Sequence, residues 1–124
     1  MSYKTLKIWE LARAVVIDVH EMTLKLPRFE LFEEGSQIRK SSKTTKAAIV
    51  EGYGRRRYKQ DWIKFLVYAL SSNCETMDHL ENLWETKSLN DAIVFTNLQN
   101  KIDSLGKMLN GFLQTVEVGH QSVK

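Results

Sequence analysis

The chain has one proline, one cysteine and six glycines among 124 residues, and it has no long apolar run. So little proline and glycine leaves few points at which an element must stop, which predicts long uninterrupted elements. The single cysteine, Cys74, excludes an internal disulfide and suits a reducing compartment. No stretch approaches the ~18 apolar residues of a membrane helix, and the residues after Met1 lack a signal-peptide pattern. We therefore expect a soluble cytoplasmic protein without membrane contact.

What remains is the composition of an ordinary globular protein, with 43% hydrophobic and 27% charged residues. A chain of this length can bury one core but is too short for two. We therefore predict a single domain that covers residues 1–124.

The spacing of apolar residues predicts four amphipathic helices. These residues recur at alternating steps of four and three, which places them on one stripe of a helix. The predicted helices cover about 4–26, 33–53, 58–86 and 90–117. Because the connections between them are short, neighbouring helices should be antiparallel. We predict an all-α fold, an up-down-up-down antiparallel four-helix bundle.

Each helix is expected to give one stripe to the core. The four stripes are Ile8, Ala12, Val15, Val19, Met22 and Leu26; Ile38, Ser42, Thr45 and Ile49; Leu66, Leu70, Asn73, Met77, Leu80 and Trp84; and Phe95, Leu98, Ile102, Leu105, Leu109, Phe112 and Val116. Pro27 should end the first helix, and Gly52 or Gly54 should stop the second. Ser88 or Asn90 is expected to cap the fourth.

Further apolar residues lie outside these stripes. They are Leu11, Val16, Ile17, Trp62, Ile63, Val67, Tyr68, Ile93 and Val94. Two explanations are open: the core is wider than one stripe per helix, or some of these residues form an interface between subunits. We favour self-association, with Trp62 as a candidate interface residue.

Positive charge is concentrated in one segment of the chain. Residues 37–64 contain nine Lys or Arg and two acidic residues, a local net charge of +7. Residues 1–36 sum to −1 and residues 65–124 to −3, so this segment alone makes the protein basic. Such concentration indicates an anionic partner, and nucleic acid is the first candidate.

The candidate nucleic-acid-binding residues are basic side chains on the second helix and the connection after it. They are Arg39, Lys40, Lys43, Lys46, Arg55, Arg56, Arg57 and Lys59. Guanidinium groups bind phosphates in bidentate fashion, and the interleaved Tyr53 and Tyr58 can stack on unpaired bases. The alternative is a solvated helix face with cations that complement the negative C-terminus of the helix. Only one or two cations are needed to complement the C-terminus of one helix.

No catalytic or metal-binding constellation is evident. Di-iron bundles require Glu-x-x-His on two helices, and neither His20 nor His79 has a glutamate three residues before it. His120 lies in the polar tail. Cys74 is expected to be a small buried apolar group without a paired base. We therefore expect no catalytic residue, no metal and no cofactor.

Several short motifs occur in a familiar order. They are Leu6-x-Ile-Trp9-x-x-Ala12, Leu26-Pro-x-Phe-Glu30, Gln37-Ile-Arg39, Ile49-Val-Glu-Gly52, Phe65-Leu-x-x-Ala69 and Ser72-x-x-Glu75. With these motifs, residues 3–115 resemble the small bacterial four-helix-bundle proteins that are encoded by intervening sequences in 23S rRNA genes and often called S23 ribosomal proteins. The accessory subunit of diversity-generating retroelements is similar.

This resemblance implies a four-helix subunit that assembles into a ring, a homopentamer in related proteins. It also implies nucleic-acid binding, which has been attributed to the retroelement relatives, and no established enzymatic activity. The family typically has Ser-Ile/Val-Pro-x-Asn-Ile-Ala-Glu-Gly at the end of the second helix. The matching stretch here, 44–52, lacks the proline and the asparagine, so the roles of those two residues do not carry over.

Glu51 and Glu75 are acids at matching family positions. A catalytic carboxylate pair would need them close together with one shifted pKa. The alternative, which we favour, is that each caps a helix or pairs with a neighbouring cation such as Arg39. We predict a non-enzymatic, oligomeric nucleic-acid-binding accessory protein. A scaffold whose basic surface binds an acidic protein is the main alternative, and an enzyme acting on RNA is a third.

Overall fold

The structure is a computed structural model that describes residues 2–119. It contains α1 (Lys7–Thr23), α2 (Glu34–Gly54), α3 (Lys59–Glu85) and α4 (Ala92–Gly119), with two short 3₁₀ turns, η1 (Tyr3–Thr5) before α1 and η2 (Arg28–Leu31) between α1 and α2. His120, expected in the tail, lies outside the described residues.

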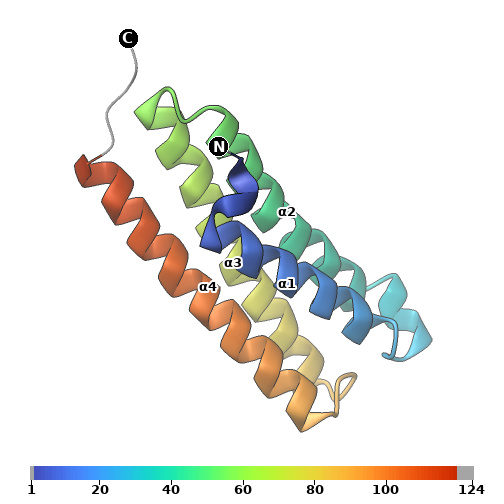
Figure 1. Cartoon of the computed structure of the whole chain (residues 1–124). Helices are drawn as coiled ribbons and strands as arrows, with labels where there is room; N and C mark the ends of the chain where they lie inside the picture. The colour runs from blue at the N-terminus through green and yellow to red at the C-terminus, as the bar shows by residue number, and fades with distance from the viewer. Residues whose placement is uncertain (1, 120–124) are drawn as a thin grey trace.

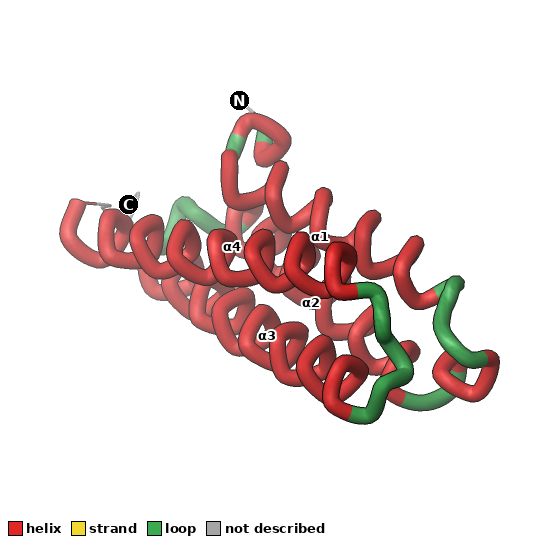
Figure 2. The backbone as a smooth tube through the Cα atoms, turned by 90° about the horizontal axis from the view of Figure 1, so that it is seen from below, coloured by secondary structure: helices red, strands yellow, loops and turns green. Residues whose placement is uncertain are grey.

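The four helices form one antiparallel bundle. Each helix packs against the helices before and after it in the chain, and α4 closes the arrangement against α1. Figure 1 shows the helices side by side, and Figure 2 shows their connections at the two ends of the bundle. Residues 2–119 contain no strand. The predicted all-α four-helix bundle is confirmed.

The helix ends differ from the predicted bounds by a few residues. The first helix was expected from residue 4 to 26, but α1 covers Lys7–Thr23 because its two ends are replaced by η1 and by a turn before Pro27. The turn η1 is capped by Ser2, whose side chain accepts a hydrogen bond from the backbone N of Lys4 at 3.2 Å. Such short 3₁₀ segments are common at helix ends, and apolar spacing does not distinguish them from the helix.

The core stripes of α1, α2 and α4 follow the prediction closely. On α1 and α2 every predicted residue is buried except Leu26, which is partly buried. On α4 the central residues are buried, whereas Phe95 and Phe112 are partly buried against them. The predicted heptad pattern therefore identifies the inner face of three helices.

The inner face of α3 is turned toward α2 relative to the prediction. Trp84 is exposed instead of buried and stacks on Phe95 of α4 with ring centroids 4.6 Å apart, while Leu83 is fully buried. Small residues of α3 that apolar spacing had not selected are also buried, namely Ala69, Ser72 and Thr76. They face α2, the helix with which α3 makes its most extensive contact.

Small residues bring α2 and α3 close together. Ser41 of α2 and Thr76 of α3 share a hydrogen bond of 2.8 Å between their hydroxyl groups, and both are buried. Nearer the α2–α3 connection, a Cβ atom built on Gly52 would lie 2.7 Å from Phe65 Cβ and from ring carbons of Trp62. Close packing of two helices needs small residues at the point of contact.

The prediction that Gly52 or Gly54 stops α2 is met at Gly54, the last residue of the helix, and not at Gly52. The helix continues through both residues to Gly54, and neither glycine has a positive φ. Arg55 follows as the C-cap residue, with its backbone N–H directed to Glu51, Gly52 and Tyr53 carbonyls. Gly52 therefore serves close helix packing rather than termination.

The apolar residues outside the predicted stripes divide into two groups. Trp62 is buried inside the bundle, with ring contacts to Tyr53 and Phe112, so its proposed place at an interface is wrong. Leu11, Ile63 and Val94 also pack on the core. Val16 is partly buried, and a remainder stays exposed, namely Ile17, Val67, Tyr68 and Ile93. A wider core therefore explains only part of the set.

The expected burial of Cys74 is also wrong. Its side chain is exposed on the outer side of α3. The physical reason is that α3 turns its inner face toward α2. Residues such as Cys74, which lie on the side of Leu66 and Asn73 opposite to α2, therefore point away from the core. Among the described helices, none is long and apolar enough to cross a membrane.

The start of α4 gives a first testable prediction. The cap is Asp91 rather than Ser88 or Asn90, since Asp91 Oδ1 accepts hydrogen bonds from the backbone N of Ile93 at 3.0 Å and of Val94 at 3.2 Å. We expect Asp91→Ala to lower the free energy of unfolding by about 1 kcal/mol, because two amide groups lose their partner. Thermal unfolding followed by circular dichroism measures this, with Asn90→Ala as the matched control. A larger loss in the control than in Asp91→Ala would contradict this assignment.

Candidate nucleic-acid interface

Lys40 and Lys43 are the most accessible cations of α2. They lie three residues apart and therefore on one side of the helix, and both are exposed. Neither has an ion-pair partner among the residues that the structure describes. Two uncompensated cations about one turn apart can meet neighbouring phosphates of one strand.

Lys46 and Lys59 are only partly exposed. Lys46 points toward α1, where its Nζ lies 5.5 Å from the ring centroid of Trp9. Because of this contact, the ammonium group of Lys46 lies toward α1 and not beside Lys40 and Lys43 on the exposed side of α2. Lys59 opens α3 directly after the arginine cluster.

Arg55 lies between two carboxylates. Its guanidinium is 3.4 Å from Glu51 and 3.9 Å from Asp61, and it also covers the ring of Phe65 at 5.4 Å. The side chains of this ion-pair network are about half exposed, so the pairs add little stability. They do fix the position of Arg55, which keeps one side open to solvent.

Arg56 fits the alternative in which a cation complements the C-terminus of α2. Its Nη1 donates a hydrogen bond to the Tyr53 carbonyl at 2.9 Å, and its guanidinium lies 3.8 Å from the centroid of the Tyr53 ring. Arg57 instead extends past Tyr58, with a ring distance of 5.8 Å, and both residues are exposed. One arginine of the cluster thus has a structural task, while the next one faces solvent.

Arg39 differs from the other candidate residues because it points inward. Its Nη2 donates to the carbonyl of Leu31 at 2.9 Å, which ties α2 to η2, and Nη1 is buried without a hydrogen-bond partner in the described part of the chain. A guanidinium in this position cannot reach a phosphate without leaving Leu31. We therefore define the basic surface as Lys40, Lys43, Lys46, Arg55, Arg56, Arg57 and Lys59.

The basic surface follows α2 and ends at the α2–α3 connection. From Lys40 to Arg55 the helix rises by about 22 Å, at 1.5 Å per residue. Figure 1 shows the α2–α3 connection at one end of the bundle, and the sequence of this connection includes three consecutive arginines, Arg55, Arg56 and Arg57. The candidate residues other than Arg39 thus lie along α2 and at the α2–α3 end of the bundle.

Glu51 and Glu75 line the same depression between α2 and α3, which has a volume of about 380 Å³. Glu51 pairs with Arg55, so the expected pairing with a cation is observed, although Arg39 is not that cation. For Glu75 the expectation is wrong, because its side chain is exposed and has no ion-pair partner among residues 2–119. The two carboxylates therefore differ in how free they are to accept a new hydrogen bond.

Sequence reasoning missed a polar network at the opposite end of the bundle. Glu30 is only 4% exposed and accepts hydrogen bonds from Ser88 Oγ at 2.6 Å and from the backbone N of Glu34 at 3.0 Å. The Glu34 carboxylate in turn contacts His79 Nδ1 and Asn82 Nδ2. These bonds join η2, α2, α3 and the α3–α4 connection, and no local spacing in the sequence could reveal them.

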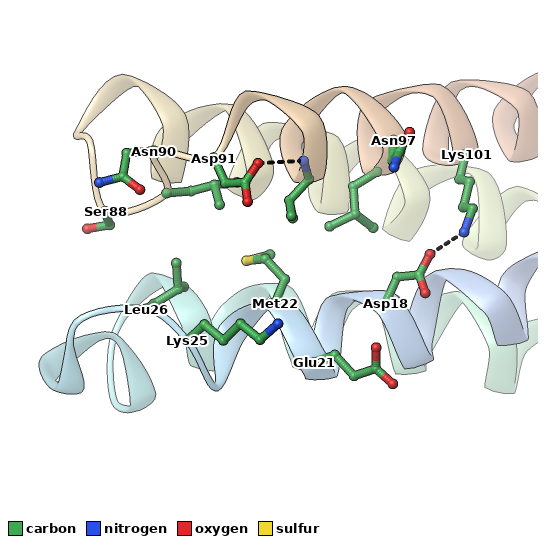
Figure 3. A pocket seen from close by; sticks show the side chains of 13 residues that line it. Asp18, Glu21, Met22, Lys25, Leu26, Ser88, Asn90, Asp91, Asn97 and Lys101 are labelled. Carbon is green, nitrogen blue, oxygen red and sulfur yellow. Dashed lines mark hydrogen bonds and ion pairs between the residues drawn. The ribbon is translucent and has the colours of Figure 1, made fainter.

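A cavity of about 460 Å³ opens between α1 and the start of α4 (Figure 3). Its most prominent polar groups already have partners, since Lys101 pairs with Asp18 across it and Asp91 caps α4. Ser88 is bonded to Glu30. Glu21, Lys25, Asn90 and Asn97 also line it and have no side-chain partner among the described residues, but acidic and basic groups are mixed in this cavity, so it does not present charge of one sign as the basic surface does. Within residues 2–119 no group of three or more His, Cys, Asp or Glu is placed to hold a metal ion.

Comparison with known proteins identifies the family. The sequence model of the 23S rRNA-intervening sequence protein family matches residues 4–111. A solved structure from Bacteroides thetaiotaomicron, described as a protein of unknown function from the S23 ribosomal protein family, is similar with a TM-score of 0.63 and 21% identity, over 85% of this chain and 99% of that chain. At this identity the likeness shows the fold. No curated protein matches the chain in sequence. Because the family match covers most of the chain, this protein belongs to the 23S rRNA-intervening sequence protein family.

Proposed function

We propose that this protein is a non-enzymatic nucleic-acid-binding protein that holds the phosphates of RNA or DNA on its basic surface. The observation that carries the proposal is the pair of exposed cations Lys40 and Lys43, which have no ion-pair partner among the described residues and lie on the helix that leads to the exposed Arg57 at the α2–α3 connection. Phosphate contacts of this kind provide affinity without sequence preference. The resemblance to the accessory subunit of diversity-generating retroelements supports the same partner.

Self-association is part of the proposal. Ile17, Val67 and Ile93 remain exposed after the core is complete, and exposed apolar residues that come together in a patch are commonly covered in an oligomer. A ring, as in the pentameric relatives, would repeat the basic surface and increase the affinity for a long strand through avidity. A reducing, cytoplasmic setting suits the exposed Cys74, which elsewhere would be open to intermolecular disulfide formation.

Titration with nucleic acid across a salt series tests the proposal. We expect single-stranded and duplex RNA and DNA to bind at low salt, because the basic surface contacts phosphates common to all of them. With about four phosphate contacts on a single strand, the affinity should fall about 50-fold between roughly 50 and 200 mM salt. Fluorescence anisotropy of a labelled strand measures the affinity at low salt and its decrease as salt rises.

Two results would count against the proposal. If no nucleic acid binds at about 50 mM salt, the basic surface has another partner, and an acidic protein becomes the better hypothesis. If binding is insensitive to salt, phosphates are not the contacted groups. Light scattering of the free protein tests the oligomer separately, because a strict monomer at micromolar concentration would remove the ring.

A further inference from the structure

The depression between α2 and α3 adjoins the basic surface, and we call it the α2–α3 groove. It is lined by Thr44, Ala47, Ala48, Glu51, Phe65, Tyr68, Ser71, Ser72 and Glu75. Its volume of about 380 Å³ lies at the lower end of the range for small-molecule sites. Most of the lining residues are small, and no Lys or Arg lines it.

Cations nevertheless border the groove at its aromatic end. Phe65, which lines it, carries Arg55 at 5.4 Å and the Nζ atom of Lys64 at 5.9 Å from its ring centroid. On the α2 side, Lys43 lies one turn before Ala47. A strand whose phosphates contact these cations would therefore pass directly over the groove.

The two carboxylates of the groove exclude a phosphate from its interior. An ionised carboxylate only accepts hydrogen bonds and repels a phosphate. The hydrogen-bond donors of a nucleic acid are on its bases and, in RNA, on the ribose 2′-hydroxyl groups. Among the bases, guanine offers two donors side by side, N1–H and N2–H. This pair matches the two oxygens of one carboxylate. In a duplex these donors are used in base pairing, so only an unpaired guanine can present them.

Glu75 is the carboxylate that is free to make this contact. Glu51 is held by Arg55 at 3.4 Å, whereas Glu75 lacks an ion-pair partner among the described residues. Tyr68 lies two turns before Glu75 on the same face of α3, about 10 Å away along the helix axis. A purine that stacks on Tyr68 can extend its Watson–Crick edge toward Glu75.

Tyr68 is suited to stacking because it is held in place and open. Its ring is perpendicular to that of Phe65, with centroids 5.6 Å apart and an interplanar angle of 89°. It is 47% exposed, and Lys64 Nζ lies 5.8 Å from its centroid. Exposed aromatic rings beside cations are the usual platform for unpaired bases.

We propose that the α2–α3 groove binds one unpaired guanine of a single-stranded nucleic acid. Tyr68 stacks on the base, Glu75 accepts hydrogen bonds from N1–H and N2–H, and the flanking phosphates contact Lys43, Arg55 and Lys64. This inference rests on the proposed function and adds a base preference to it. The phosphate contacts would otherwise be indifferent to sequence.

Three short RNAs test this inference. One is a strand of about twelve uridines, the second carries a single guanosine at its centre, and the third carries inosine there, which lacks the N2 amino group. We expect the guanosine strand to bind about 5- to 20-fold more tightly than the all-uridine strand. The inosine strand should lie between them, because it keeps N1–H only.

Two variants assign the preference to the groove. Glu75→Gln should reduce the guanosine preference to less than about 2-fold, since an amide presents only one acceptor oxygen, while binding of the all-uridine strand is retained. Tyr68→Ala should weaken all three strands by about the same factor, because stacking is shared by every base. Glu81→Gln, at an exposed position of α3 outside the groove, is the matched control and should keep the preference.

The outcomes separate this inference from the proposed function. If the wild-type protein binds all three strands equally and in a salt-dependent way, the groove has no base preference and the inference fails alone. If none of the strands binds at low salt, the proposed function itself fails. If Tyr68→Ala or Glu75→Gln changes the molar mass of the free protein in light scattering, the groove is a subunit contact and the inference is overturned.

Discussion

Reversing three charges of the basic surface, Lys40→Glu, Lys43→Glu and Arg57→Glu, should weaken binding of single-stranded RNA on the order of 100-fold at low salt. Each substitution removes one cation from the phosphates and places a negative charge near the strand. The slope of the logarithm of affinity against the logarithm of salt concentration should decrease by about 2 to 3, close to one for each phosphate that is no longer neutralised. Anisotropy titrations at several salt concentrations measure both quantities.

These three positions are chosen because the structure gives them no role in the fold. Lys40 and Lys43 have no ion-pair partner among the described residues, and Arg57 extends into solvent beside Tyr58. Arg39 and Arg56 are unsuitable, since their guanidinium groups donate to backbone carbonyls and their loss would disturb local structure. Helicity and thermal stability should therefore remain unchanged in the triple variant.

The control must change the net charge by the same amount elsewhere. Lys7→Glu, Lys25→Glu and Lys107→Glu do so at exposed positions of α1, of the turn after it and of α4. We expect this triple variant to lose less than about 5-fold in affinity, because long-range effects of net charge are screened by salt. If both triple variants lose affinity equally, net charge rather than the basic surface governs binding, and the proposed site is wrong.

The sequence predicts the fold well because the apolar stripes of three helices are nearly complete. It fails on α3, where the face toward α2 is made of Ala69, Ser72 and Thr76. These residues carry little hydrophobic signal, yet their small size lets the two helices come close. Trp84 therefore lies outside this face, stacked on Phe95 of α4, and Cys74 is exposed. Predicting this would require knowing which helix is the neighbour and how near it comes.

The sequence indicates which part of the chain carries the positive charge, but not the contacts of the individual side chains. A run of charge without acidic neighbours identifies α2 and the α2–α3 connection as the basic part of the molecule. The separation of Arg39 from that set depends on the Leu31 carbonyl in η2, a turn that apolar spacing does not indicate. The pairing of Glu34 with His79 joins residues 45 positions apart. Contacts of this kind depend on the folded arrangement.

The contact between α2 and α3 shapes both the core of the bundle and the α2–α3 groove. Gly52 adjoins Glu51 in sequence and packs on Phe65, which lines the α2–α3 groove. The spacing of the two helices at this point therefore fixes both the core around Trp62 and the width of the groove. A substitution that separates the helices here should disturb stability first and the groove with it.

Gly52→Ala should accordingly be the most destabilising single-methyl change in this part of the bundle. The added Cβ would lie 2.7 Å from Phe65 Cβ and from two ring carbons of Trp62. Phe65 Cβ is attached directly to the backbone of α3, so a rotamer change cannot move it and the helices must shift apart. Overpacking of this kind typically costs about 1–3 kcal/mol and occasionally more, against roughly 1 kcal/mol returned by the higher helix propensity of alanine.

We expect a net loss of about 1–2 kcal/mol in the free energy of unfolding, equivalent to a fall of about 4–8 °C in the melting temperature. Gly111→Ala is the matched control, because Gly111 lies within α4 and a Cβ there would meet no atom within 4 Å. That variant should be stabilised by about 0.5–1 kcal/mol through helix propensity alone. Thermal and urea unfolding of both variants measure the two changes in the free energy of unfolding, which should have opposite signs. If Gly52→Ala is as stable as Gly111→Ala, α2 and α3 are not in close contact at this point. The α2–α3 groove and the guanine proposed to bind in it both depend on that contact.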